Sequence, residues 1–389
     1  MRMRFELPEP SAEAREHSAR LARLVAARIA AGGGWMDFPD YMDLALYAPG
    51  LGYYSAGTAK LGPSGDFVTA PEISPLFARC LARAIAPVLR AQAGASVLEL
   101  GAGSGALAAQ LIPALLRLGA APERYLILEV SADLRERQRA LLSPAAGQAW
   151  PAVEWLDALP DAPLDGVVIA NEVADALPVS RFTICDGAAQ ALGVCATPGG
   201  FGWAARPARP ALAAAVSRLL PGGTGAFAEG YTSEISQRLP GWIAALAAAL
   251  GAGALLLCDY GMARSEYYHP QRSQGTLGCH YRHRFHDDPF HLPGLQDITA
   301  WVDFTAVAEA AQASGLEVAG YATQAHFLLD AGLDLELAGD GDAVPLRLAQ
   351  QAKTLLLPGE MGERFKVMAL TRGTVPMRGF GFRDLRHSL

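Results

Sequence analysis

The pattern of apolar and polar positions changes character along the chain. Apolar residues recur at helical spacing over 11–29, and three consecutive glycines follow at 32–34. This spacing predicts an amphipathic helix that ends at the glycines. Over 35–75, aromatic residues, glycines and prolines cluster without a period, which predicts short helices and structured loops.

From residue 95 onward, short apolar runs alternate with segments of helical periodicity. We predict buried strands at 96–100, 125–130, 166–171 and 254–259, with helices at 106–117 and 132–142. Strands that alternate with helices form βαβ units, which build a parallel sheet with helices on both faces. The predicted fold class is therefore α/β, with a Rossmann-like, mostly parallel sheet.

Two segments interrupt this alternation. Runs of β-type residues at 181–185 and 191–196, separated by glycines, indicate antiparallel strands in or beside the sheet. Between 328 and 357, two helical segments separate a strand near 318 from one at 365–370. We expect one compact domain over 95–389, with a helical and loop cap at 1–94 and insertions near 179–240, 262–300 and 328–360.

Composition and charge narrow the classes of partner. The chain has 389 residues, of which 51% are apolar and 18% charged, which excludes a disordered chain. Its net charge of -7 does not favour bulk attraction to nucleic acid or an anionic membrane, so we expect neither as a partner. The five cysteines show no C-x-x-C spacing, and we see no signal peptide or bilayer-spanning run. We therefore expect a cytoplasmic protein.

A glycine-rich segment at 99–105 carries the first candidate chemistry. It reads Glu-Leu-Gly-Ala-Gly-Ser-Gly and lies between a predicted strand and a predicted helix. Glycines let the backbone approach a ligand closely, and a helix start offers unpaired N–H groups. Dinucleotide sites use G-x-G-x-x-G, whereas here the third glycine comes one place earlier. With Glu99 in front, the segment looks like the S-adenosylmethionine turn of class I methyltransferases; a turn without ligand is the alternative.

Polar side chains also end two further strands. Glu129 can accept both hydroxyls of a ribose, which indicates an adenosine-containing ligand without choosing between NAD and S-adenosylmethionine. Asn171 and Glu172 close the strand at 166–171, and Asp175 follows them. Their carboxylates can pair with a cationic acceptor at the ligand-binding edge of the sheet. Helix capping and ordinary surface charge are the alternative explanation.

Ordered motifs over nearly the whole chain resemble a known family. The sequence is similar to the MidA family of S-adenosylmethionine-dependent methyltransferases, related to the mitochondrial complex I assembly factor that methylates a protein arginine. The resemblance rests on residues 41–47, 52–54, 65–74, 99–101, 129–131, 170–172, 175–178, 259–261, 281–285, 297–304, 323–324, 327–328, 361–362 and 365–367.

This resemblance implies a class I methyltransferase fold, S-adenosyl-L-methionine as the cofactor, and a protein substrate with an arginine acceptor. It also implies that the N-terminal cap, through residues 65–74, folds over the cofactor site; a capped loop, in which Asp66 and Thr69 bond their own backbone and Pro71 starts a turn, is the alternative. The implied cofactor-binding residues are Glu99, Gly101, Ala102, Gly103, Gly105, Glu129, Asn171, Phe67 and Thr69. The implied catalytic residues are Glu172, Asp175, Asn171 and Asp66, with Asp259 behind them.

The sequence departs from the family at two places. Ala102 and Ser104 stand where the family has proline and arginine, and Val173 and Ala174 stand where it has two phenylalanines. The second departure leaves an alternative open, a cofactor-binding assembly factor or chaperone with weak or no methyl transfer. An NAD-dependent oxidoreductase is the other alternative, and it rests on the glycine turn alone. The oligomeric state, including a homodimer, stays open.

One cysteine and four histidines gather at 279–291. Histidines are common zinc ligands, and two of these are three residues apart. However, the segment resembles the family's loop, whose histidines are not a recognised metal set. We therefore expect no metal, and substrate contact or hydrogen bonding within the loop instead.

Overall fold

The computed structural model describes residues 7–55, 69–142, 150–338, 344–373 and 375–389. The chain divides into two compact units. The first is formed by residues up to 67 together with 176–238 and 264–301, and the second by 68–175, 239–263 and 302–389. The segments expected as insertions near 179–240 and 262–300 thus belong with the N-terminal residues, whereas 69–94 belong with the predicted sheet.

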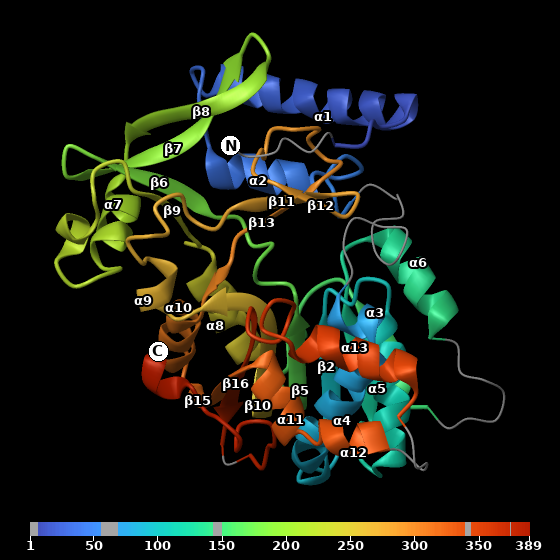
Figure 1. Ribbon diagram of the computed structural model, residues 1–389. Helices are drawn as coiled ribbons and strands as arrows, with labels where there is room; N and C mark the ends of the chain where they lie inside the picture. The colour runs from blue at the N-terminus through green and yellow to red at the C-terminus, as the bar shows by residue number, and fades with distance from the viewer. Residues whose placement is uncertain (1–6, 56–68, 143–149, 339–343, 374) are drawn as a thin grey trace. The chain divides into compact units, whose positions relative to one another are not determined.

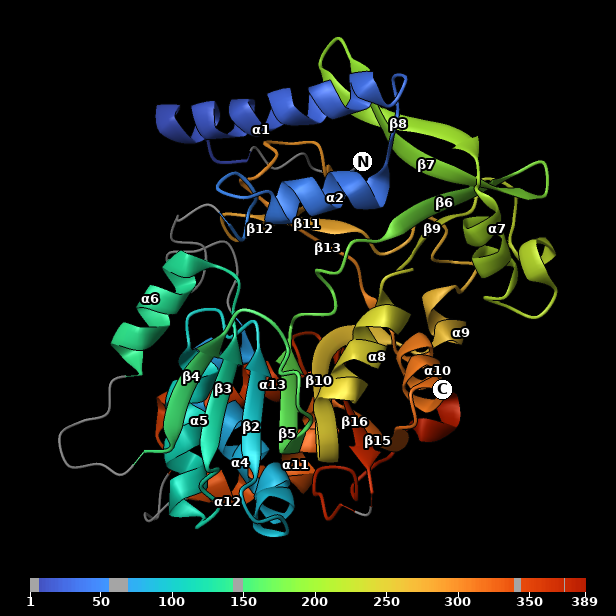
Figure 2. The ribbon, with the colours of Figure 1, turned by 180° about the vertical axis from the view of Figure 1, so that it is seen from behind.

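The second unit is built on a mostly parallel sheet (Figures 1 and 2). Its strand order is β15–β16–β10–β5–β2–β3–β4, and a short β14 also pairs with β10. Neighbours from β4 to β10 are parallel, whereas β16 is antiparallel to both β10 and β15. The bounds are β2 Ser96–Leu100, β3 Arg124–Leu128, β4 Ala152–Leu156, β5 Leu164–Asn171, β10 Leu250–Met262, β14 Val302–Asp303, β15 Glu317–Thr323 and β16 Phe365–Arg372. These strands confirm the predicted α/β fold class.

Helices cover both faces of this sheet (Figures 1 and 2). On one face, α4 and α5 pack together over alternate strand residues such as Val97, Ile127 and Ile169. Side chains alternate along a strand, so these positions share one face. Elsewhere α8 and α10 pack against each other and against β10. The bounds are α3 Ala70–Ile73, α4 Pro75–Arg90, α5 Ala106–Arg117, α6 Ala132–Leu141, α8 Leu239–Ala249, α10 Phe304–Ala313, α11 Gln324–Asp330, α12 Leu333–Ala338 and α13 Leu346–Leu356.

The first unit contains antiparallel sheets and has its own core. Five strands pair in the order β1–β7–β6–β9, with β8 on β7, and three more pair as β12–β11–β13. The antiparallel pairing of β6 with β7 confirms the strands predicted at 181–185 and 191–196. Leu21, Val25 and Ile29 of the predicted N-terminal helix pack in this core with Phe38 and Tyr41. The bounds are α1 Ala12–Ala31, β1 Met36–Asp37, α2 Phe38–Tyr47, β6 Ser180–Cys185, β7 Ala188–Thr197, β8 Gly200–Pro207, α7 Pro210–Ser217, β9 Thr232–Ile235, α9 Arg264–Tyr267, β11 Gly278–Tyr281, β12 Arg284–His286 and β13 Asp297–Thr299. The first unit also has a short 3-10 helix, η1 Gly223–Ala226, and the second unit has another, η2 Arg386–Ser388.

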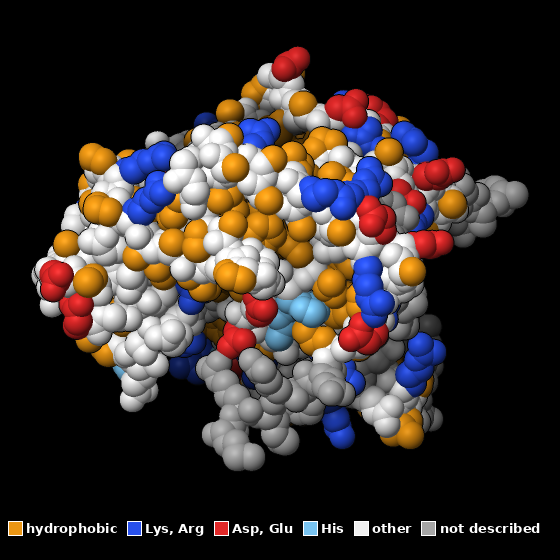
Figure 3. Space-filling model, turned by 90° about the horizontal axis from the view of Figure 1, so that it is seen from above, with side chains coloured by type: hydrophobic (Ala, Val, Ile, Leu, Met, Phe, Trp, Pro, Cys, Tyr) orange, Lys and Arg blue, Asp and Glu red, His pale blue; other side chains and the backbone are white. Residues whose placement is uncertain are grey.

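Acidic and basic side chains alternate on the face of the molecule shown in Figure 3, with apolar atoms between them. The side chains drawn in colour on that face therefore form no extended patch of one sign. Within the described residues, every helix is too short or too polar to cross a bilayer.

Two glycines set how closely the central strands of the second unit approach. Gly166 on β5 has a φ of +131°, and a Cβ there would lie 2.1 Å from the carbonyl oxygen of Ser96 on β2. A Cβ at Gly253 on β10 would lie 1.9 Å from the carbonyl oxygen of Gly166. At these crossings, only the absence of a side chain lets the strands pair.

We expect Gly166→Ala to lower the free energy of unfolding by about 3 kcal/mol, because it combines an unfavourable φ with a backbone clash. Gly241→Ala in α8 is the matched control, since nothing lies within 4 Å of its Cβ position. The control should change stability by less than about 1 kcal/mol, in the stabilising direction. Urea unfolding of both variants checks this, and equal midpoints would contradict it.

Candidate active site

The glycine turn joins β2 to α5 in the second unit. Gly101, Gly103 and Gly105 have φ values of +57°, +55° and +83°, the left-handed region that glycine adopts readily. The N–H of Gly101 donates to the carbonyl oxygen of Leu128 at 2.9 Å, which ties the turn to β3. Gly105 precedes α5 and provides no side-chain cap. The first N–H groups of α5 are therefore left without a side-chain cap, and their contact with a ligand remains a prediction.

Glu129 lies just after β3 and is only 5% exposed. Its Oε1 accepts from the N–H of Ser131 at 2.9 Å, and its Oε2 accepts from the amide of Gln138 at 3.2 Å. Burial raises the pKa of this carboxyl, which these hydrogen bonds partly offset. A carboxylate oxygen can accept more than one bond, so both oxygens retain capacity for ribose hydroxyls. The residues present thus fit the predicted adenosine ligand.

Glu99 lies within β2, and its side chain turns toward the neighbouring strand. Its Oε2 accepts a hydrogen bond from the hydroxyl of Tyr125 on β3 at 2.5 Å. Burial raises the pKa of Glu99 to about 7, the Tyr125 hydrogen bond opposes that rise, and the charge of Glu129 adds to it. Cofactor contact by Glu99 remains a prediction, and Tyr125 is a partner that the sequence did not indicate.

Asp259, on β10, organises the loop that follows β5. Its Oδ2 accepts from the backbone N–H groups of Val173, Ala174 and Asp175 at 3.2, 2.9 and 3.2 Å. Its Oδ1 accepts from the N–H of Tyr260 at 2.9 Å. Burial raises its pKa well above the ordinary value, and the carboxylates of Asp175 and Glu172 raise it further. This side chain is 1% exposed and holds the loop through these hydrogen bonds, and a catalytic role for it remains a prediction.

Glu172 begins this loop in the left-handed region, with a φ of +54°. Its backbone N–H donates to the carbonyl oxygen of Cys258 at 2.8 Å, which continues the hydrogen bonding between β5 and β10. Its Oε1 accepts from the N–H of Ala70 and the side-chain amide of Asn171, both at 3.3 Å. Burial, and next the charge of Asp175, raise the pKa of Glu172 to about 8. A non-glycine residue at positive φ is uncommon, and here the backbone bond to Cys258 and the side-chain bonds to Ala70 and Asn171 hold it in that conformation.

Asp175 lies at the far end of the same loop. The hydroxyl of Tyr260 donates a short hydrogen bond to its Oδ2, and the Tyr260 ring packs edge-on against Phe365 at 5.4 Å between centroids. The structure therefore brings Asn171, Glu172 and Asp175 together, as the sequence predicts. Tyr260 was not foreseen as a site residue.

The loop at 172–175, which carries the predicted acceptor residues and is called the acceptor loop below, also lies beside the glycine turn. A Cβ at Gly101 would lie 3.4 Å from Cγ2 of Val173. Val173 stands where the family has a phenylalanine, so its smaller side chain fills the space beside the first glycine. The predicted acceptor and cofactor regions are thus neighbours in the second unit.

The segment expected to close over the cofactor is described from Thr69 onward; Asp66 and Phe67 lie outside the described residues. Thr69 and Glu72 form a reciprocal capping box at the start of α3. The amide of Gln110 on α5 donates to the carbonyl oxygen of Pro71 at 2.9 Å. These contacts, with the Ala70–Glu172 bond, hold the segment beside α5 and the acceptor loop. Direct cofactor contact by Thr69 remains a prediction.

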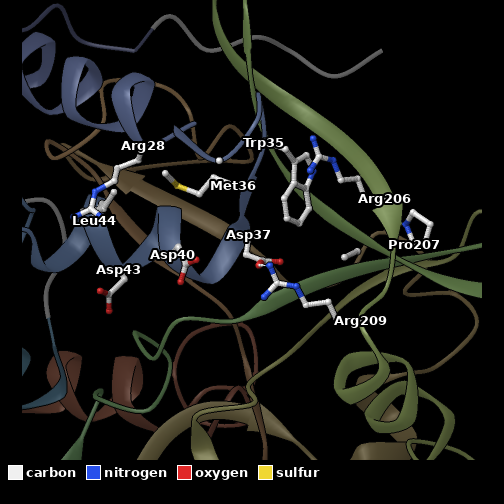
Figure 4. A pocket seen from close by; sticks show the side chains of 12 residues that line it. Arg28, Trp35, Met36, Asp37, Asp40, Asp43, Leu44, Arg206, Pro207 and Arg209 are labelled. Carbon is white, nitrogen blue, oxygen red and sulfur yellow. Dashed lines mark ion pairs between the residues drawn. The ribbon is translucent and has the colours of Figure 1, made fainter. Parts of the chain in front are cut away.

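A cavity of about 600 Å³ lies in the first unit, apart from the predicted site residues (Figure 4). Three aspartates of β1 and α2, at 37, 40 and 43, and three arginines, at 28, 206 and 209, contribute to its lining. Asp37 pairs with Arg209 at 3.1 Å, and the Arg206 guanidinium lies 4.9 Å from the centroid of Trp35. Because its charges are mixed and partly paired, the cavity indicates no particular ligand.

The histidine-rich segment forms the hairpin of β11 and β12 and the loop after it. His280 lies on β11, and burial lowers its pKa, whereas His283 lies exposed in the turn with a φ of +60°. In the described part of the chain, Cys185, Asp186 and Glu229 place their ligand atoms within 4.8 Å of one another, but all three are exposed. Exposed acidic groups of this kind are common without a metal.

Comparisons with known proteins identify the family of the chain. A family model described as "Putative S-adenosyl-L-methionine-dependent methyltransferase" matches residues 80–322. The protein arginine methyltransferase NDUFAF7 homolog of Drosophila melanogaster mitochondria is 30% identical, over 95% of this chain and 89% of its own. The mitochondrial protein arginine methyltransferase NDUFAF7 of Homo sapiens is 27% identical, over 87% of this chain and 80% of its own.

A solved structure is similar over almost the whole chain. It is a crystal structure from Burkholderia thailandensis, described as a "likely methyl transferase" and bound to S-adenosyl-homocysteine. It is 43% identical, covers 99% of this chain and 100% of its own, and superposes with a TM-score of 0.92. The predicted cofactor class, S-adenosyl-L-methionine, is confirmed.

We expect Asp259→Ala to lower the free energy of unfolding by about 3 kcal/mol or more, because it leaves several buried N–H groups without an acceptor. Asp259→Asn should retain most of the stability, since its amide oxygen can still accept from the loop. Asp165→Ala is the control, because its Oδ1 accepts one exposed N–H, from Ala252 at 2.7 Å. Urea unfolding compares the three, and an alanine variant no weaker than the asparagine variant would refute the role.

Proposed function

Because the chain belongs to the family of S-adenosyl-L-methionine-dependent methyltransferases, we propose that it methylates an arginine side chain of a protein substrate. The names of the NDUFAF7 relatives support the acceptor. The acidic cluster at the carboxyl ends of β5 and β10 supports it independently. Glu172, Asp175 and Asp259 lie there together, and the loop that carries the first two contacts the glycine turn.

The acidic cluster is the observation that carries this proposal. Burial and mutual repulsion raise the pKa values of Glu172 and Asp259, so their ionised forms are unfavourable until a cation lies beside them. A guanidinium offers five N–H donors in a planar fork that matches carboxylate oxygens. A neutral acceptor would leave these groups without compensation.

We assign Glu172 and Asp175 to the acceptor. An arginine side chain stays protonated in water, and its nitrogen lone pairs are delocalised, so it is a poor nucleophile. Carboxylates on one side of the guanidinium localise its positive charge there and leave the opposite nitrogen free to attack. When a methyl group is added, the guanidinium must lose one proton. Glu172, with a pKa of about 8, is suited to accept it.

Other residues of the second unit bind the cofactor in this proposal. The glycine turn lets the cofactor approach the backbone closely, because Gly101, Gly103 and Gly105 have no side chains. Glu129 binds the ribose hydroxyls. When bound, S-adenosyl-L-methionine supplies an electrophilic methyl group on a sulfonium. The residues at 69–74, held by Gln110 and Glu172, exclude water from the edge of this site.

We expect Glu172→Gln to slow single-turnover methyl transfer about a hundredfold while the dissociation constant for S-adenosyl-homocysteine changes little. The substitution keeps the shape of the side chain but removes the charge that orients the acceptor. The rate is measured as the transfer of labelled methyl groups from S-adenosyl-L-methionine to arginine-bearing proteins. Glu154→Gln on β4 is the control, because this exposed residue pairs with Arg124 and not with the acidic cluster.

Each other outcome is informative. Loss of cofactor affinity would place Glu172 in the cofactor site, and full retention of rate would transfer its role to Asp175 or Asp66. If the unaltered protein binds cofactor tightly but transfers no methyl group to any arginine-bearing protein, the assembly-factor alternative replaces the enzyme.

The reaction should also respond to pH. The raised pKa keeps Glu172 neutral below about pH 8, and only the ionised form attracts the guanidinium. We therefore expect kcat/KM for the acceptor to rise with pH through about 8 and then level off, since this parameter reports the free enzyme. Arginine itself does not titrate in this range. The profile should flatten in Glu172→Gln, and an unchanged step there would assign the titration to another group.

A further inference from the structure

Helix α6 buries one side chain completely, and that side chain is polar. Among its residues, Gln138 alone is buried, at 0% exposure, while its neighbours face solvent or are half-buried. A helix normally packs through a stripe of apolar residues, and a buried amide is unfavourable unless its hydrogen bonds are made. Gln138 therefore requires an explanation beyond packing.

The amide of Gln138 links three elements of the second unit. Its Nε2 donates to the carbonyl oxygen of Gly103 at 2.9 Å and to Oε2 of Glu129 at 3.2 Å. Its Oε1 accepts from the indole N–H of Trp155, on β4, at 2.8 Å. Because an indole N–H can only donate, it fixes the amide orientation and directs both amide N–H groups to the other two partners.

Both of those partners belong to the cofactor site. Gly103 is the middle glycine of the turn and adopts a φ of +55°. A hydrogen bond to its carbonyl oxygen selects that peptide orientation. The bond to Glu129 holds a carboxylate whose other oxygen is held by Ser131. One amide thus sets the relative placement of the turn and the ribose-binding carboxylate.

We propose that Gln138 is a positioning residue for the ribose of S-adenosyl-L-methionine. It acts through Glu129 and Gly103 and needs no contact with the cofactor itself. Preorganised groups bind more tightly because less ordering occurs on association. The proposal rests on the cofactor class and on the proposed binding of the ribose by Glu129. It is independent of the arginine acceptor, so failure of arginine methylation would leave it standing.

The test compares S-adenosyl-homocysteine with its 3′-deoxyribose analogue by calorimetry. In the unaltered protein, loss of the hydroxyl should weaken binding about tenfold or more, since one hydrogen bond to a charged group is lost. Gln138→Met keeps the side-chain length without the amide. We expect it to bind S-adenosyl-homocysteine about tenfold more weakly and to discriminate the two ligands by threefold or less.

Gln324→Met is the matched control. Gln324 is also buried, at 1% exposure, and its amide donates to the carbonyl oxygen of Leu355 at 3.0 Å, away from the glycine turn and Glu129. We expect this control to lose stability and keep the full discrimination between the two ligands. If Gln138→Met weakens both ligands equally and keeps full discrimination, its role is structural and the proposal fails.

A second variant covers the case in which Gln138→Met does not fold. Trp155→Phe keeps an aromatic ring and removes the donor that orients the amide. We expect it to reduce discrimination against the 3′-deoxy analogue by about threefold. The proposal is overturned if Trp155→Phe discriminates between the two ligands as the unaltered protein does, and Gln138→Met either does not fold or also keeps the full discrimination.

Discussion

One carboxylate determines the shape of the acceptor side of the site. Oδ2 of Asp259 accepts from three consecutive backbone N–H groups after β5, at 173–175. A side chain on β10 can do this because β5 and β10 are parallel neighbours and Cys258 pairs with Asn171. A loop carrying acidic side chains would otherwise turn them toward water. Here Asp259 fixes the backbone of the loop, and this fixed backbone determines where Glu172 and Asp175 lie.

The same arrangement explains the unusual electrostatics. Three carboxyl groups lie close together, and both burial and their mutual charges raise the pKa values of Glu172 and Asp259. Asp259 makes enough backbone hydrogen bonds to remain buried. Within the described ranges, the side chain of Glu172 accepts only from Ala70 and Asn171, at 3.3 Å each, which are long contacts for a charged acceptor. Glu172 is therefore the member of the cluster best suited to exchange partners when a cation arrives.

The sequence predicts much of this site, because apolar runs and the polar residues at the ends of those runs are local signals. Apolar runs locate β2, β3, β5 and β10, and the carboxyl ends of these strands carry Glu129 and Glu172. The partners Gln138, Tyr125 and Tyr260 could not be predicted, because each meets its carboxylate only after strands pair or helices dock. The division into units was hidden for a similar reason. It depends on antiparallel pairing of distant segments, such as β1 with β7 and β6 with β9.

The two networks meet at the glycine turn. Gln138 holds the carbonyl oxygen of Gly103, while Val173, whose N–H is bound by Asp259, lies beside Gly101. A shift of the turn would therefore disturb its contact with Gln138, its contact with Val173, or both. A Cβ at position 101 would lie 3.4 Å from the valine methyl group, so the glycine and the valine are direct neighbours across the turn and the loop. The missing side chain at 101 and the small one at 173 thus let the turn and the loop lie side by side.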